Sequence, residues 1–226
     1  MSTATQSPTV SSTSERGLRP THDELRQNVQ LLIQLRWAAG FGILSITAFA
    51  RYVLDIRLQT TALLLIGLAV LVYNFLLSIT FRGDTTARQV ERAAWVQIIL
   101  DWIAMTALVH FTGGITSPAL IYFMIHAALA GTVLLPWQAR SLALLATAIV
   151  IGIALSEREG ILPHVAIPEF EMSSALYQNG TYITGVVFFF GTAIFTLSEL
   201  VTRIAQRLRQ REERIRELYE ARSTFL

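Results

Sequence analysis

Long apolar runs alternate along the chain with short stretches that carry arginine, glycine or proline. Each run approaches the ~20 residues that an α-helix needs to cross the apolar core of a bilayer. The runs predict six membrane spans, at 37–54, 60–81, 93–111, 117–135, 139–156 and 180–201. We therefore expect an all-α polytopic membrane protein, with residues 37–201 as a six-helix transmembrane domain.

The segment before the first span divides into two parts. Residues 1–20 are rich in Ser and Thr and lack apolar periodicity, which predicts a disordered tail. Residues 21–36 combine charged and apolar positions at helical spacing. We expect them to form an amphipathic helix on the cytoplasmic face of the membrane that leads into the first span.

The segment after the last span, 202–226, becomes charged without a proline or glycine to end the helix. Apolar residues recur in it at alternating steps of four and three, the pattern of a helix that pairs with a copy of itself. The seam consists of Val201, Ile204, Leu208, Arg211, Ile215, Leu218, Arg222 and Phe225. Arginine at two seam positions predicts a marginally stable, parallel dimeric coiled coil with two nearly balanced packings, suited to signalling.

Composition and charge support the membrane assignment and exclude several chemistries. The mean hydropathy is +0.49, too apolar for an ordinary soluble domain. The chain has no cysteine, which excludes disulfides and thiol redox chemistry within it. All 18 basic residues are arginines. They concentrate before the first span, in the even-numbered loops and after the sixth span, which places both termini in the cytoplasm. The N-terminal set is Arg16, Arg19, Arg26 and Arg36.

Asp101 is a charged residue in the middle of the third predicted span. A carboxylate there costs about 2.5–3.5 kcal/mol on insertion scales, so it needs a partner inside the bundle. Helical depth places Asn74 and His126 at nearly the same level as Asp101. The three could form a buried polar cluster that either joins helices by hydrogen bonds or takes up and releases protons. One Asp and one His are too few ligands for a metal site.

The connection between the third and fourth spans is the second candidate site. It could be no more than a short hairpin, since Gly113 and Gly114 allow a tight reversal and Pro118 can begin the next helix. Hydrogen-bonding groups nevertheless lie beside aromatic rings at one membrane face, which would suit a lipid-soluble ring with carbonyl oxygens, such as a quinone. The candidate residues are His110, Phe111, Thr112, Gly113, Gly114, Ser117, Pro118 and Tyr122.

The run LDWIAMTALVHFTGGITSPALIYFM resembles the third and fourth spans of the membrane domain of redox-responsive sensor histidine kinases of the RegB/PrrB type. In that family an Asp precedes a GGxxNPF loop implicated in ubiquinone binding. Asp101, Gly113, Gly114 and Pro118 match this pattern, while Ser117 and Ala119 replace its Asn and Phe. The resemblance implies a multi-pass protein of the bacterial inner membrane, with a quinone as the one candidate cofactor.

The end of the chain, RIRELYEARSTFL, is similar to the signalling helix that enters the dimerisation domain of histidine kinases. In that family the phosphorylated histidine and the ATP-binding domain follow such a helix. The resemblance implies a homodimer, a kinase core after Leu226 and a response regulator as partners, and no nucleic acid.

The function expected from the sequence is therefore the input domain of a two-component sensor histidine kinase, with no catalytic residues of its own in this segment. Two alternatives stay open. The same sensor could serve another output domain, or the chain could be a small six-helix transporter or channel. No span is visibly interrupted and no inverted repeat is evident, which weighs against transport.

Overall fold

The computed structural model describes residues 22–80, 87–169 and 173–224, and this part of the chain is helical, without a strand. Six long helices make up the fold, as the apolar pattern predicts. They are α2 (His22–Tyr52), α3 (Thr60–Thr80), α4 (Ala87–Phe111), α5 (Ile121–Val133), α6 (Pro136–Arg158) and α8 (Gly180–Thr224). Three single turns, η1 (Gly114–Thr116), η2 (Pro118–Leu120) and α7 (Ser173–Leu176), lie in the connections.

Four of the long helices are apolar and long enough to cross a membrane, which indicates a multi-pass membrane protein. These segments are Gln30–Tyr52, Thr60–Thr80, Pro136–Arg158 and Gly180–Ser223. The third and fourth predicted spans correspond to shorter apolar helices, Trp95–Phe111 and Pro118–Thr132. The topology of six crossings therefore stays a prediction.

Two element boundaries differ from those expected. The predicted change at 36–37, from a surface helix to a span, does not interrupt α2, which is continuous from His22 to Tyr52. The predicted fourth span starts with separate turns because a residue before proline avoids the α conformation. Ser117 is extended there (φ −69°, ψ 130°), and its side chain accepts a hydrogen bond from the Ala119 N–H. The tail 1–20 and Phe225 lie outside the described residues.

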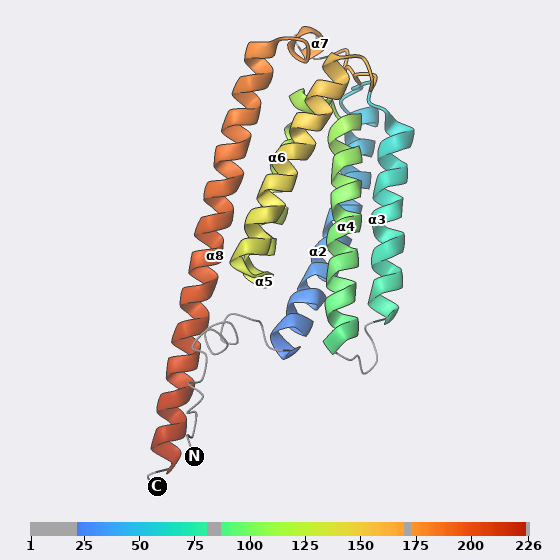
Figure 1. The fold of residues 1–226 in the computed structure, drawn as a ribbon. Helices are drawn as coiled ribbons and strands as arrows, with labels where there is room; N and C mark the ends of the chain where they lie inside the picture. The colour runs from blue at the N-terminus through green and yellow to red at the C-terminus, as the bar shows by residue number, and fades with distance from the viewer. Residues whose placement is uncertain (1–21, 81–86, 170–172, 225–226) are drawn as a thin grey trace, which may run out of the picture.

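The helices form two groups that meet along α4 and α5 (Figure 1). Helix α2 packs mainly on α3, and α8 packs on α5 and α6. Aromatic side chains fill the core between the groups: Trp102 meets Phe123, which in turn meets Phe190 of α8. Helix α2 begins and α8 ends at the same end of the bundle, and α8 extends well beyond it (Figure 1).

Candidate functional site

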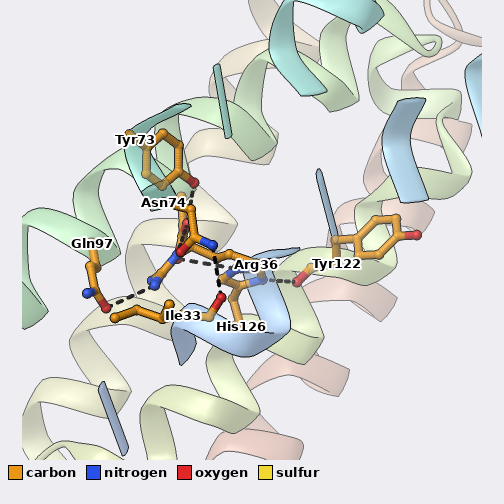
Figure 2. Close-up of polar contacts among 8 residues, drawn as sticks. Ile33, Arg36, Tyr73, Asn74, Gln97, Tyr122 and His126 are labelled. Carbon is orange, nitrogen blue, oxygen red and sulfur yellow. Dashed lines mark hydrogen bonds and ion pairs between the residues drawn. The ribbon is translucent and has the colours of Figure 1, made fainter. Parts of the chain in front are cut away.

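A buried ion pair joins α2 to α4 in the interior of the bundle (Figure 2). Arg36 donates to both carboxylate oxygens of Asp101, from Nε at 2.7 Å and from Nη2 at 2.6 Å. Its Nη1 donates to Oε1 of Gln97, one turn earlier on α4, at 2.9 Å. Arg36 and Asp101 are only 4% and 6% exposed. The planar guanidinium matches the carboxylate in geometry and neutralises its charge away from water.

Two further side chains complete the surroundings of Asp101. The Tyr73 hydroxyl donates to Oδ1 at 2.5 Å, and Nε2 of His126 lies 3.7 Å from Oδ2. Nδ1 of His126 lies 3.0 Å from the Tyr122 carbonyl oxygen, which can only accept a hydrogen bond. Nδ1 of His126 therefore carries a hydrogen, and Nε2 is the nitrogen that faces Asp101.

The predicted cluster of Asn74, Asp101 and His126 is thus brought together in part. Asp101 and His126 are neighbours. Asn74 is fully buried in the same layer, but its side chain donates to the Ile33 carbonyl of α2 at 2.9 Å (Figure 2). The main partner of Asp101, Arg36, was expected on the cytoplasmic surface, and that expectation is wrong because the side chain turns into the bundle. The contributions of Tyr73 and Gln97 were also missed.

A cavity of about 590 Å³ opens beside this cluster, between α2, α3, α4 and α5. Arg36, Tyr73, Asp101 and His126 line one end, and Thr112 and Pro118 line the other. The wall between them is mainly apolar and includes Ile43, Val70, Met105, Leu108 and Tyr122. Along α4 the cavity extends from Asp101 to Leu108, a rise of about 10 Å. It is an apolar chamber with fixed hydrogen-bonding groups at one end.

The residues predicted to bind a quinone do not all lie in one place in the structure. Thr112, Pro118 and Tyr122 line the cavity. Ser117 holds the hairpin, since its hydroxyl lies 2.5 Å from that of Thr112. Gly113 and Gly114 have positive φ values of 116° and 58°, as the tight reversal requires. His110, with Phe111 edge-on against its ring, turns to a different partner.

That partner is Glu157 of α6, whose carboxylate is sealed in at the end of the bundle opposite the C-terminus of α8. Nδ1 of His110 lies 3.2 Å from Oε1, and Nδ1 of His164 lies 2.8 Å from Oε2. The Glu157 side chain is 0% exposed, and the His164 ring stacks on Tyr177 at 4.0 Å. The backbone of Gly114 closes the site, because a Cβ there would overlap the carboxylate. The sequence places Glu157 beside a charged connection, so this cluster was not anticipated.

Within the described ranges, no group of three or more His, Cys, Asp or Glu side chains is arranged to hold a metal ion. Both clusters are therefore described as networks of hydrogen bonds and ion pairs.

Helix α5, which carries Tyr122 and His126, packs directly on α8. The contact is close at Gly131, where a Cβ would lie 3.0 Å from Oγ1 of Thr202. Beyond it, Arg209 of α8 donates to the Thr132 carbonyl of α5 at 2.5 Å. Helices α5 and α8 are therefore joined by direct packing and by a hydrogen bond.

The predicted coiled-coil seam emerges from this contact. Val201 is half-buried against the bundle, and the next seam positions are exposed. Their exposed fractions are 48% for Ile204, 53% for Leu208, 53% for Ile215 and 70% for Leu218, and Arg211 and Arg222 are exposed between and after them. The charged C-terminal half of α8 therefore exposes a row of large apolar side chains along one face.

Comparisons of the chain with models of protein families, with curated proteins and with solved structures give no match. The resemblance to sensor histidine kinases therefore stays a prediction. The function is inferred below from the cavity, from the α5–α8 contact and from the exposed face of α8.

Proposed function

We propose that this chain is the membrane input domain of a two-component sensor histidine kinase, in which α8 passes a signal from the bundle to a kinase core. The observation that carries the proposal is α8 itself, an unbroken helix of 45 residues. Its first half packs on α5 and α6, and its second half is charged apart from one row of apolar residues. Such a helix can convert a change within a bundle into a change outside it.

The stimulus in this proposal is a lipid-soluble ring with carbonyl oxygens, such as a quinone, bound in the cavity beside Asp101. Apolar walls suit the ring and its tail, and Nε2 of His126 can donate to a carbonyl oxygen when it is protonated. Arg36 and Tyr73 already donate to Asp101, so they hold the carboxylate in place. A reduced ring carries hydroxyl groups instead of carbonyl oxygens and would reverse the donor and acceptor roles at His126.

The path to α8 in this proposal runs through α5. Tyr122 and His126 lie on the cavity wall, while Gly131 and Thr132 of the same helix contact α8. A ligand that shifts α5 would change its packing on α8. The exposed seam from Ile204 to Leu218 would pair with a second copy of the chain, since apolar side chains at such spacing are stabilised by burial in a coiled coil.

Phosphorylation of the native protein is the direct test. The protein is isolated from membranes of its source cells, reconstituted in nanodiscs and supplied with labelled ATP and with oxidised or reduced ubiquinone. We expect acid-labile phosphate on the protein, in an amount that depends on the quinone form. Absence of such phosphate in both forms would reject the kinase assignment. Phosphorylation at the same level with oxidised and reduced quinone would reject the quinone as the stimulus, but not the kinase assignment.

Signalling through the proposed coiled coil is tested by Arg211→Leu. This variant replaces a seam arginine by a side chain that favours one tight packing of the two helices. We expect a more stable dimer and a phosphorylation level that no longer responds to the stimulus. Arg216→Leu, five residues further along α8 and outside the seam, is the matched control and should leave the response unchanged. A normal response in the Arg211→Leu variant would contradict signalling through the coil.

A further inference from the structure

The cluster around Glu157 has no part in the function proposed above, yet it is the most fully buried charged group at its end of the bundle. It joins three segments that are distant in sequence: His110 comes from α4, Glu157 from α6 and His164 from the connection 159–169 that follows α6. His164 also stacks on Tyr177, near the start of α8. The cluster therefore holds the connection 159–169 against the helices.

The hydrogen positions in this cluster follow from its partners. A carboxylate can only accept hydrogen bonds, so Nδ1 of His110 and Nδ1 of His164 both carry a hydrogen that points at Glu157. Nε2 of His164 is buried and has no hydrogen-bond partner within the described residues. A second proton on that ring would bury an N–H donor without an acceptor, which is costly away from water. The packed cluster thus keeps His164 as a neutral imidazole.

His110 differs from His164 in this respect. Its side chain is 13% exposed, against 4% for His164. His110 can keep its hydrogen bond to Glu157 when His164 leaves, so the carboxylate retains one donor. The connection can then leave the bundle, and Nε2 of His164 becomes free to bind a proton from water.

We propose that His110, Glu157 and His164 form a proton-operated latch, which holds the connection 159–169 on the bundle at neutral pH and releases it on acidification. The released state binds one more proton than the latched state, at Nε2 of His164. A state that binds more protons is favoured as the pH falls. A histidine in water is half protonated near pH ~6.5, so the switch works in the range where histidine titrates.

Other charged groups also lie near the connection 159–169. The pair between Arg57 and Glu169, at 3.1 Å, also ties the connection to the segment between α2 and α3. Desolvation, the largest single effect, raises the pKa of Glu169, but hydrogen bonds from backbone groups and from Arg57, together with the Arg57 charge, outweigh it and lower the pKa overall. Glu169 therefore stays ionised above pH 5. Among the described residues, the other titratable groups nearby are Arg158 and Glu159, which lie 4.0 Å apart and are exposed, and Tyr177, whose ring stacks on His164.

The latch is tested by the accessibility of a single thiol. The chain has no cysteine, so Ile167→Cys supplies a unique probe at a position that is 8% exposed. Ile161→Cys, in the same connection but 80% exposed, is the matched control for the reactivity of the reagent at each pH. The protein is placed in nanodiscs, so that both membrane faces are accessible, and is labelled with a maleimide at pH 7.5 and 5.5.

We expect the labelling rate at position 167, relative to position 161, to rise about tenfold from pH 7.5 to pH 5.5, because opening is linked to one proton. His164→Asn retains an N–H donor for Glu157 but cannot bind the proton, so the relative rate should not change with pH. A flat ratio in the parent protein, or a tenfold rise that persists in His164→Asn, would overturn the proposal.

A second variant keeps the test decisive if His164→Asn does not fold. Glu157→Gln removes the negative charge that both imidazoles share, and the relative rate at position 167 should then be high at both pH values. A low rate at both pH values in Glu157→Gln would show that burial of Ile167 does not depend on the cluster, and would also overturn the latch. Neither result bears on phosphorylation, so the latch and the kinase assignment stand or fall separately.

Discussion

Asp101 and Glu157 are both buried carboxylates, but they are held by different kinds of side chain. Asp101 is held by the guanidinium of Arg36, which stays protonated at every pH that the protein meets, with Tyr73 as a further donor. Glu157 accepts hydrogen bonds from two imidazoles, the side chain type that titrates nearest neutral pH in water. The first cluster borders a cavity, and the second is closed by Gly114 and by the connection that carries His164.

The difference separates a permanent arrangement from a conditional one. An arginine–carboxylate pair keeps the same hydrogen bonds whatever the pH, so it can fix the wall of a ligand cavity. A histidine–carboxylate cluster loses or gains partners with a single proton, so it suits a contact that must be released. The variants below test this contrast, in order of decreasing effect on stability.

Arg36→Met should have the largest effect, because it leaves the Asp101 carboxylate buried without its cation. Breaking a buried ion pair costs about 3–5 kcal/mol, and the loss would appear as a lower midpoint in denaturant unfolding of the purified protein. The double variant Arg36→Met/Asp101→Asn removes both charges and should recover most of that stability. A double variant no more stable than Arg36→Met would contradict the ion pair as the source of the loss.

Gly114→Ala should disturb the cluster around Glu157, because the Gly114 backbone lies against the carboxylate. The φ value of 58° is strained for alanine by about 1–2 kcal/mol, and the new Cβ overlaps the Glu157 carboxylate. Together these effects should cost about 2–3 kcal/mol and expose the connection 159–169 at neutral pH. Gly152→Ala, in α6 with open space around it, is the control and should be neutral or stabilising by up to ~1 kcal/mol. Equal losses in both variants would contradict the close approach at Gly114.

Tyr73→Phe sharpens the first half of the comparison by removing one hydrogen bond from Asp101 while Arg36 remains. A bond to a charged group contributes about 1.5–3 kcal/mol, and the lower end applies because the bidentate contact persists. The midpoint in denaturant should shift less than in Arg36→Met. Tyr52→Phe, at a position that is 80% exposed, should shift it not at all. A loss as large as that of Arg36→Met would mean that the hydroxyl, not the guanidinium, holds the carboxylate.

Arg57→Gln should have the smallest effect, since the pair with Glu169 is exposed and surface ion pairs contribute little to stability. The lowered pKa of Glu169 makes its stabilising contribution present above the pKa of the unfolded chain and lost as the pH falls through the folded value. Without Arg57 that pKa should rise toward the ordinary value, which NMR titration of the Glu169 side chain would detect. Parent and variant should become equally stable once the pH lies well below the folded pKa of Glu169. An unchanged pKa would contradict the pair.

The sequence predicted the helices well because each is a long apolar run with clear breaks, and the six long helices are confirmed. It predicted Asp101 and His126 as neighbours because both lie at a similar distance from the hairpin that joins their helices, and therefore at a similar depth in the membrane. It did not find Arg36, since an arginine close to the start of a span looks like a surface anchor. The side chain is long enough to turn inward, and only the packing of α2 on α4 decides its direction.

Glu157 and His164 were missed for a different reason. They are separated by proline- and glycine-containing segments, and their contact with His110 depends on how the connection folds back over α4 and α6. No periodicity encodes that path. Gly114 was assigned to a tight reversal, which its φ value bears out, but its second role against the Glu157 carboxylate appears only when α6 is in place.

The length of α8 has a mechanical consequence. At about 1.5 Å per residue, its 45 residues form a rod of roughly 67 Å. A tilt of only about 5° about one end of such a rod moves the other end by roughly 6 Å, more than one helical turn of about 5.4 Å. A helix of this length acts as a lever arm: a small tilt at one end becomes a large displacement at the other.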